Sequence, residues 1–257
     1  MQKNNKKEAT PYLVPALERG LKILEMLSMH PAGLLMGEMK DLQLPNASLY
    51  RMLITLTELG YIIRDEHDRY HLGRKLLSVG YRGLSNANLP EKAAPFMRKL
   101  RDLTNETAAL GVLSGGEGVV IDTVHSEQPV CVYVKVGHHF PLHTAAPAKA
   151  MLAFLPEDEL ENLINKITFT GFTERTITDK KSFLAELKKI KESQIAYDMG
   201  EECNELRCIA SPILDSRNYP AAAVWITGPA SRLNGKKLKE YAILVKETAT
   251  KIANHIA

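Results

Sequence analysis

Residues 44–61 carry the clearest helical pattern in the chain. Apolar residues recur there at steps of three and four and form one stripe: Leu49, Met52, Leu53, Leu56 and Leu59. The same spacing turns a second set away from that stripe: Ala47, Tyr50, Arg51 and Thr55. Pro45 suits a first helical position, and Asn46 or Ser48 can cap the opening turn. Gly60 can end the helix, so the pattern predicts a helix with one buried face and one free face.

A second short amphipathic segment, residues 36–43, lies directly before this helix and leaves only Leu44 and Pro45 for a turn. Two helices joined by so few residues form a helix-turn-helix, whose second helix commonly enters the major groove of DNA. Helical hairpins with tight turns are common, and most of them bind no nucleic acid. The pattern alone therefore only suggests a DNA-binding helix.

The flanking segments strengthen that interpretation. Residues 61–64 and 69–72 alternate apolar and polar side chains around an Asp-rich stretch, which predicts a two-stranded hairpin. Pro15 opens a further helical pattern over residues 12–27, with one leucine stripe: Leu17, Leu21, Leu24 and Leu27. Together these elements predict a winged helix. Arg64 and Arg69 flank the hairpin turn, where they could contact DNA phosphates; the alternative is that they are solvated charges.

The predicted domain organisation has four parts. Residues 1–10 form a disordered tail, and residues 11–73 form the winged helix-turn-helix domain. Residues 74–89 keep a helical spacing and are interpreted as a linker helix, although they could also belong to the core of the first domain. Residues 90–257 form the second domain.

The second domain mixes strand and helix patterns. Strands are predicted at 108–113, 119–124, 130–136, 207–214 and 221–227, with turns at 114–118 and 215–218. Helices are predicted around Phe96 to Leu103, over 147–155, 157–165 and 180–193, and from 236 to the C-terminus. Hairpins bracketed by helices argue for an α+β domain with helices packed on a sheet.

Composition places the chain among globular proteins and excludes several classes. It has 257 residues, of which 45% are apolar and 25% charged, and its longest apolar runs are far shorter than the ~20 residues that cross a bilayer. No apolar signal core follows the N-terminal lysines, so we expect a cytoplasmic protein with no membrane partner. Three cysteines without a CxxC spacing indicate neither a disulfide framework nor a zinc ribbon.

The net charge of +3 is unevenly placed. Residues 1–89 hold twelve Lys and Arg against nine Asp and Glu, an excess of three, so the remainder is neutral. This weak basic bias is compatible with DNA binding and is no stronger evidence than that.

The second domain contains residues typical of several chemistries. The Gly-rich stretch 114–118 lacks phosphate-loop motifs and is better explained as a hairpin turn. His138, His139 and His143, with Asp122, could bind a metal; Pro141 breaks any helix that would align them, so loop histidines are favoured. We predict neither a metal nor another cofactor.

Two further features of the second domain each allow two interpretations. Cys208 with Asp198 and a histidine could be a thiol nucleophile set, but a cysteine within an apolar strand is more often a packing group. Residues 143–152 open a helix with small side chains, which leaves its amides accessible to a ligand carboxylate. Close packing of helix on sheet explains the same small residues equally well.

These residues lead to a resemblance along nearly the whole chain. It rests on 17–24 (LERGLKIL), 50–53 (YRML) with 59–61 (LGY), 70–73 (YHLG), 141–143 (PLH), 148–153 (AKAMLA), 207–212 (RCIASP) and 227–229 (TGP) followed by Arg232. In the order and spacing of these motifs the chain resembles the IclR family of bacterial transcription regulators. The resemblance implies a winged helix, a linker helix used in dimerisation, and a GAF-like α/β domain that binds a small organic acid.

The resemblance also assigns candidate effector-binding residues. In the family pocket the ligand carboxylate meets backbone amides at the small-residue helix start, which falls here on Ala146 and Pro147. Other pocket positions fall on these residues: Phe140, Asp198, Cys208, Trp225 and Thr227. Ala148 replaces a common glycine, Pro147 removes one amide donor, and Trp225 stands where small or hydroxyl residues are frequent, so the ligand class is the least secure transfer.

The sequence therefore predicts a ligand-responsive transcription factor and not an enzyme. Asn46, Ser48 and Tyr50 are expected near bases, with Arg51 on a base edge or a phosphate. Expected partners are double-stranded operator DNA, an organic-acid effector, further copies of the chain in a homodimer or homotetramer, and RNA polymerase. The target would be a catabolic operon that is repressed or activated.

Two alternatives remain open at this point. One is an enzyme that acts on a small acid and uses the winged helix only for docking, although no paired acid and base supports it. The other is an architectural DNA-binding protein whose second domain is inert.

Overall fold

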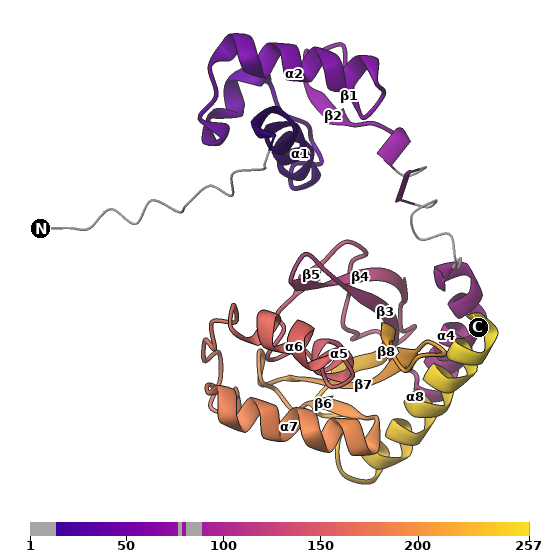
Figure 1. Cartoon of the computed structure of the whole chain (residues 1–257). Coiled ribbons are helices and arrows are strands. Elements are labelled where there is room, and N and C mark those ends of the chain that lie inside the picture. The colour runs from indigo at the N-terminus through magenta and orange to yellow at the C-terminus, as the bar shows by residue number, and fades with distance from the viewer. Residues whose placement is uncertain (1–13, 77–78, 81–88, 257) are drawn as a thin grey trace, which may run out of the picture. The chain divides into compact units, whose positions relative to one another are not determined.

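In the computed structural model, two α-helices and two 3₁₀ turns precede a hairpin in the first part of the chain (Figure 1). The structure describes residues 14–76, 79–80 and 89–256. The elements of the first part are α1 (Pro15–Ser28), the 3₁₀ turns η1 (Met36–Glu38) and η2 (Lys40–Leu42), α2 (Asn46–Glu58), β1 (Ile62–Arg64) and β2 (Tyr70–Leu72). The chain divides into two units at residues 86 and 87, and each unit is described by itself.

The predicted helix over residues 36–43 is wrong, because the structure has the two short turns η1 and η2 there. Met39 between them is buried in the core of the unit, and Gln43 ends the second turn with a φ of 49°. A segment of eight residues that contains Gly37 is too short and too weak a helix former to complete an α-helix. The helix-turn-helix is thus formed with an irregular first element.

The boundaries of α2 differ slightly from the prediction. Pro45 occupies the N-cap and not the first helical position, and neither Asn46 nor Ser48 makes the predicted side-chain cap. The predicted stop is confirmed, because Leu59 is the C-cap and Gly60 follows with a φ of +76°. A left-handed residue after the C-cap is where glycine is favoured.

The leucine stripe predicted for α1 is only half correct. Leu27 is buried, but Leu17 and Leu21 are 63% and 51% exposed, and Ile23 takes the second buried position. Only the C-terminal half of α1 packs into the core of this unit, whose buried members are Ile23, Leu27, Leu34, Met39, Leu49, Leu53, Ile62 and Tyr70. The N-terminal half has no such partners among the described residues.

The predicted hairpin is confirmed. β1 and β2 pair antiparallel, with Arg64 opposite Tyr70. The Asp65 carboxylate organises the turn, since its Oδ1 accepts hydrogen bonds from the amides of His67 and Arg69, both at 2.9 Å. A hydrogen bond from His71 at 2.8 Å, followed by these amides, lowers the pKa of Asp65 to about 2. The turn is therefore fixed by a permanently ionised side chain at neutral pH.

The predicted tail (1–10) lies outside the described residues, and so does most of the predicted linker helix (74–89). Within the ranges that the structure describes, no helix has the length and apolar character needed to cross a membrane.

The second unit contains a six-stranded antiparallel sheet in the order β5-β4-β3-β8-β7-β6. Its strands are β3 (Thr107–Ser114), β4 (Glu117–Val124), β5 (His139–Phe140), β6 (Ala196–Asp198), β7 (Leu206–Leu214) and β8 (Pro220–Pro229). Its helices are α4 (Leu89–Thr104), α5 (Ala146–Leu152), α6 (Glu157–Ile164), α7 (Lys180–Ser193) and α8 (Gly235–Ile256). This arrangement confirms the predicted α+β class.

Alternation along the strands explains why helices cover both faces of the sheet. The even-numbered residues of β3 and β8, such as Ala108 and Val224, pack with α4 and α8. Their neighbours, such as Ala109 and Trp225, pack with α5 and α7 on the other face. Figure 1 shows α4 and α8 together on one side of the sheet and α5 to α7 on the other. Successive strand side chains point to opposite faces, so one short segment serves two cores.

The third strand predicted at residues 130–136 is wrong. These residues form an irregular segment, and the two-residue strand β5 pairs with β4 instead. The segment is fastened by side chains and not by a strand ladder: Thr107 and Arg232 donate to the carbonyls of Val132 and Val130, both at 2.8 Å. An alternating pattern predicts an extended chain, but it does not supply a partner strand.

Candidate functional site

The free face of α2 presents the side chains that the helical spacing turned away from the core. Asn46, Tyr50, Arg51 and Thr55 are exposed, and Ser48 is half-buried. Within the described ranges, the Arg51 guanidinium has neither a hydrogen-bond nor an ion-pair partner. The face therefore offers a cation, a phenol and short polar groups within about three helical turns, which suits base edges and phosphates.

The two arginines of the hairpin lie in different environments. Arg64 is exposed and pairs with Asp68 at 2.7 Å, with its guanidinium 5.8 Å from the centre of the Tyr70 ring. Arg69 instead donates to the carbonyl of Gly33 at 3.0 Å and to Glu38 at 3.1 Å. Arg64 is therefore available at the surface, whereas Arg69 ties the hairpin to the segment before α2.

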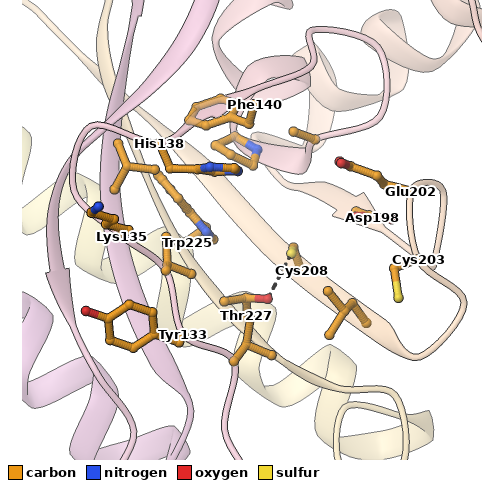
Figure 2. A pocket seen from close by; sticks show the side chains of 16 residues that line it. Tyr133, Lys135, His138, Phe140, Asp198, Glu202, Cys203, Cys208, Trp225 and Thr227 are labelled. Atoms are coloured by element: carbon orange, nitrogen blue, oxygen red, sulfur yellow. Dashed lines mark hydrogen bonds between the residues drawn. The ribbon is translucent and has the colours of Figure 1, made fainter. Parts of the chain in front are cut away.

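A cavity of about 310 Å³ opens on the sheet of the second unit (Figure 2). Its lining contains six of the seven predicted effector residues: Phe140, Pro147, Asp198, Cys208, Trp225 and Thr227. The seventh, Ala146, is fully buried at the start of α5 and does not line the cavity, although its neighbour Ala145 does. Segments far apart in the sequence thus meet at one place.

Two glycines make room for the aromatic wall of this cavity. The rings of Phe140 and Trp225 meet edge to face, with their centres 5.6 Å apart. A Cβ atom at Gly118 would collide with the Phe140 ring, and one at Gly111 would lie 3.1 Å from the Trp225 ring. The large side chain at Trp225 is therefore accommodated by the facing strand and packs as part of the core.

The acidic side of the cavity comes from β6 and the loop after it. Asp198 Oδ1 accepts hydrogen bonds from the amides of Gly200 at 2.9 Å and Glu201 at 2.7 Å. Burial raises the pKa of Asp198, and these two hydrogen bonds oppose that shift. Glu202 and Cys203 also line this side.

Cys208 contributes a protonated thiol to the cavity. Its Sγ donates to the Thr227 hydroxyl at 3.2 Å, and burial, followed by the charge of Asp198, raises the pKa of Cys208 to about 12. A nucleophilic cysteine needs a thiolate, which this environment disfavours. The structure thus supports a packing and hydrogen-bonding role, and not the nucleophile alternative.

The opposite side of the cavity is basic. Lys135 and His138 line it, and Figure 2 shows them across the cavity from Asp198 and Glu202. The sequence did not identify Lys135 or Tyr133 as site residues, because the segment that carries them was predicted as a strand, and it named His138 only as a possible metal ligand. The available signal was the lysine between the last two valines of the segment and the histidines that follow it.

The three histidines considered for a metal site lie in separate environments. His138 lines the cavity, His139 pairs with Glu117 at 2.6 Å, and the buried His143 contacts the carbonyl of Thr170 at 2.9 Å. Among the residues that the structure describes, no group of three His, Cys, Asp or Glu side chains could hold a metal ion.

A helix-turn-helix followed by a β-hairpin, joined in one chain to an α+β unit with a cavity on its sheet, defines the class of two-domain DNA-binding regulators. Two family models match this chain: the IclR helix-turn-helix domain over residues 16–66, and the bacterial transcriptional regulator IclR C-terminal domain over residues 81–254. The chain belongs to the IclR family.

Named relatives agree with this assignment. The regulator KdgR of Escherichia coli K12 is 33% identical over 208 residues, which cover 80% of this chain and 79% of KdgR. The repressor AllR of the same organism is 31% identical over 240 residues, which cover 93% of this chain and 89% of AllR. Because these relatives are transcriptional regulators, the chain is a DNA-binding transcriptional regulator and not an enzyme.

A solved structure supports the fold. The IclR homologue of Microbacterium hydrocarbonoxydans, determined in complex with 4-hydroxybenzoate, superimposes with a TM-score of 0.82 at 20% identity. The match covers 94% of this chain and 98% of that one.

Proposed function

We propose that this regulator binds a small organic acid in the cavity of its second unit and that the bound acid changes its affinity for operator DNA. The observation that carries the proposal is the cavity itself, which is partly apolar, has charged groups on opposite sides, and gathers six of the residues that the sequence predicts to bind the effector. A concave, mostly apolar site with a few convergent polar groups is the usual form of a small-molecule site.

In this proposal the effector carboxylate lies at the start of α5, at the positions that the resemblance assigns to it, Ala146 and Pro147; Ala145 and Pro147 line the cavity there. Among the described residues, the amide of Ala146 donates no backbone hydrogen bond outside the helix, and Pro147 has no N–H. Lys135 and His138 make one side of the cavity attractive to an anion. Asp198, Thr227 and the Cys208 thiol can pair with hydroxyl or carbonyl groups of the same ligand. The 4-hydroxybenzoate complex of the Microbacterium homologue supports ligand binding by this fold.

On the DNA side, α2 would enter the major groove. Asn46, Ser48 and Tyr50 would lie near bases, and Arg51 would contact a base edge or a phosphate. Arg64 would contact a phosphate beside the groove, and Arg69 would mainly hold the hairpin in place, with its remaining donors near the backbone.

Effector binding would act by shifting the population between arrangements of paired subunits. It can do so only by the difference between its affinities for those arrangements. The functional form would be a homodimer or homotetramer on a palindromic operator of a catabolic operon, in the cytoplasm where the chromosome lies, with RNA polymerase as the machinery that is repressed or activated.

The cavity provides its own reporter for the test. Trp225 is the only tryptophan in the chain, so intrinsic fluorescence excited at its indole reports on this site. We expect at least one of four probes, pyruvate, glycerate, gluconate or 4-hydroxybenzoate, to change that fluorescence with saturation and to raise the melting temperature in a concentration-dependent way. An inert second domain would show neither response.

Asp198→Asn tests the role of the cavity, because it keeps the shape of the side chain and removes its negative charge. The effector should bind to this variant with altered affinity while DNA binding without effector stays the same. Loss of DNA binding together with effector binding would mean that the substitution unfolds the chain.

A further inference from the structure

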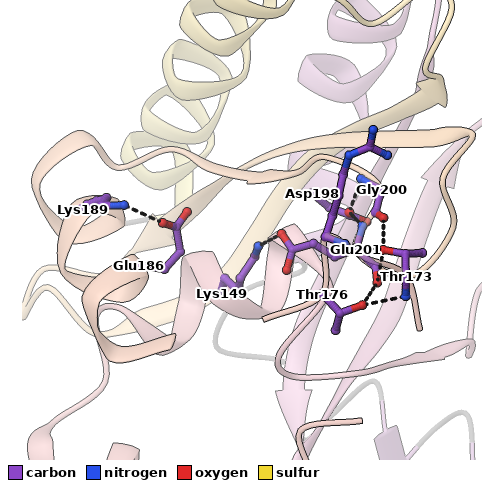
Figure 3. Close-up of polar contacts among 9 residues, drawn as sticks. Lys149, Thr173, Thr176, Glu186, Lys189, Asp198, Gly200 and Glu201 are labelled. Carbon is purple, nitrogen blue, oxygen red and sulfur yellow. Dashed lines mark hydrogen bonds and ion pairs between the residues drawn. The ribbon is translucent and has the colours of Figure 1, made fainter. Parts of the chain in front are cut away.

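A buried ion pair lies behind the cavity and is not used by the proposed effector contacts. Lys149 on α5 is fully buried, Glu201 is 6% exposed, and Lys149 Nζ donates to Glu201 Oε1 (Figure 3). The second carboxylate oxygen, Glu201 Oε2, is buried and has no hydrogen-bond partner among the described residues. Such a pair is weak evidence for stability, because apolar residues of similar volume often stabilise a core equally well.

The pair joins two walls of the cavity. Lys149 lies one turn into α5, where its amide donates to the carbonyl of Ala145 at 3.1 Å, and Ala145 and Pro147 line the cavity. On the other side, the amide of Glu201 donates to Asp198 Oδ1 at 2.7 Å, and Asp198 also lines the cavity. One residue, Glu201, therefore contacts the cavity carboxylate with its backbone and α5 with its side chain.

Two threonines fix the backbone of the same loop. Thr173 Oγ1 donates to the carbonyl of Gly200 at 2.7 Å, and Thr176 Oγ1 donates to the carbonyl of Glu201 at 2.6 Å. Figure 3 shows these contacts on one side of Glu201 and Lys149 on the other. The two threonines thus hold the loop whether or not the Glu201 side chain is charged. The link between the loop and α5 depends on the ion pair.

We propose that the Lys149–Glu201 ion pair positions Asp198 and the first turn of α5 for effector binding, so that loss of the charge on Glu201 weakens the affinity for the effector. This inference rests on the proposed function, because it concerns the same cavity. Lys149 and Glu201 are positioning residues, since they act through their neighbours and do not line the cavity.

The charges around Glu201 set the pH range of this effect. Glu201 faces Lys149 from α5, Asp198 from β6 and Glu186 from α7, and Glu186 is itself 3.4 Å from Lys189. Arg207 on β7 lies near Asp198. Burial raises the pKa of Glu201 to about 7, while the charge of Lys149 opposes the shift. The carboxylate therefore changes charge near neutral pH.

Two physical effects predict opposite directions for the effector. If only the field of Glu201 mattered, protonation would remove a negative charge near an anionic ligand and strengthen binding. If the ion pair positions the cavity walls, protonation weakens binding. We therefore expect the affinity to fall as the pH is lowered from 8 to 6, by at most about tenfold per pH unit for one proton.

The test measures the dissociation constant of the tightest-binding of the four probe acids by calorimetry on the full-length protein at pH 6, 7 and 8. We expect Glu201→Gln to weaken binding by about tenfold at pH 8, the scale of one hydrogen bond to a charged group. We also expect this variant to lose the part of the pH dependence that is due to Glu201. The difference between the two profiles therefore measures the contribution of Glu201. The exposed pair Lys251–Glu247 supplies the control variant Glu247→Gln, whose profile should match the wild type.

A second variant guards against misfolding. Lys149→Met combined with Glu201→Met replaces the pair by apolar side chains of similar length and should fold, yet bind the acid weakly and without the Glu201 contribution. Wild-type affinity in this double variant, an unchanged profile in Glu201→Gln, or tighter binding at pH 6 in the wild type would each overturn the inference. If none of the four acids binds to the wild type, the proposed function fails and the inference fails with it.

Discussion

The two units of this regulator present their candidate side chains in opposite ways. On α2, Tyr50 and Arg51 are adjacent in sequence and exposed on one helix face. In the cavity, Phe140, Asp198 and Trp225 come from β5, β6 and β8 and are all buried. The first site needs only local helix geometry, whereas the second exists only when the whole sheet has formed.

This difference predicts how the two sites respond to substitution. A change on the exposed face of α2 should remove a proposed contact with DNA and leave the core intact, because these side chains contact little of their own unit. A change in the cavity should alter both the proposed effector binding and folding, because the same side chains fill the core. The following experiments test that contrast, in order of decreasing effect.

The largest effect is expected for Trp225→Ala. The indole is buried against Phe140 and Gly111, and truncation of a buried aromatic side chain typically costs about 3–5 kcal/mol of unfolding free energy. Denaturant unfolding followed by circular dichroism measures the loss. Trp225→Phe should cost less, since it retains more of the volume. A loss below about 1 kcal/mol for Trp225→Ala would show that the aromatic wall is not part of the core.

Arg51→Ala should change DNA binding without changing stability. A bidentate arginine contact to guanine contributes about 1–3 kcal/mol of discrimination. Fluorescence anisotropy with operator and random duplexes measures both affinities, and Lys188→Ala, an exposed residue of α7, is the charge-matched control. Loss of preference for the operator indicates a base contact, and equal weakening on both duplexes indicates a phosphate contact. An unchanged operator affinity would remove α2 from the proposed interface.

The pH dependence of stability should also separate the units. The folded-state pKa of Glu201 is raised to about 7 from its ordinary 4.5, so the folded chain binds the extra proton between these values. Binding of this proton by Glu201 stabilises the folded state. Its contribution to the unfolding free energy is complete below pH 4.5 and is lost as the pH rises through 7, by at most about 1.4 kcal/mol per pH unit. Unfolding followed by Trp225 fluorescence at pH 5.5 and 7.5, in the wild type and Glu201→Gln, measures the difference. Equal slopes in the two proteins would contradict the shifted pKa.

The smallest effect is expected for the hairpin arginines. Arg64→Ala should weaken DNA binding modestly and lower the unfolding free energy by at most about 1 kcal/mol, because its pair with Asp68 is exposed. Arg69→Ala should instead lower the melting temperature, because it removes the contacts to Gly33 and Glu38. Differential scanning fluorimetry and anisotropy on both variants make the comparison. The reverse assignment of the two effects would show that Arg69 is the main phosphate contact.

The predictions from sequence are most accurate where structure is local. The helices at 157–165 and 180–193 and the hairpins at 62–72 and 107–124 are confirmed within one or two residues. Helical spacing also selects the exposed face of α2 correctly. Each of these depends on side-chain periodicity and on turn residues that lie within the segment itself.

The wrong predictions also share a cause, because each depends on contacts between segments that are distant in sequence. Leu17 and Leu21 satisfy the helical spacing but stay exposed, and 130–136 alternates like a strand but forms none. The short strand β6 gives no pattern at all over three residues. The places of Lys135 and His138 in the cavity, and of Glu201 behind it, depend on contacts between distant segments. From the sequence, only the family resemblance, and not the spacing, assigns Asp198, Cys208 and Trp225 to one site.

The central claim is that the first unit binds specific DNA and the second unit controls that binding through a small acid. The most direct measurement is the anisotropy of a labelled duplex from the promoter region of this regulator and of a random duplex, at moderate ionic strength, with and without each of the four acids. The account predicts a preference for the promoter duplex of about a thousandfold or more and a shift in that affinity with at least one acid. Equal affinity for both duplexes, unchanged by every acid, would contradict it.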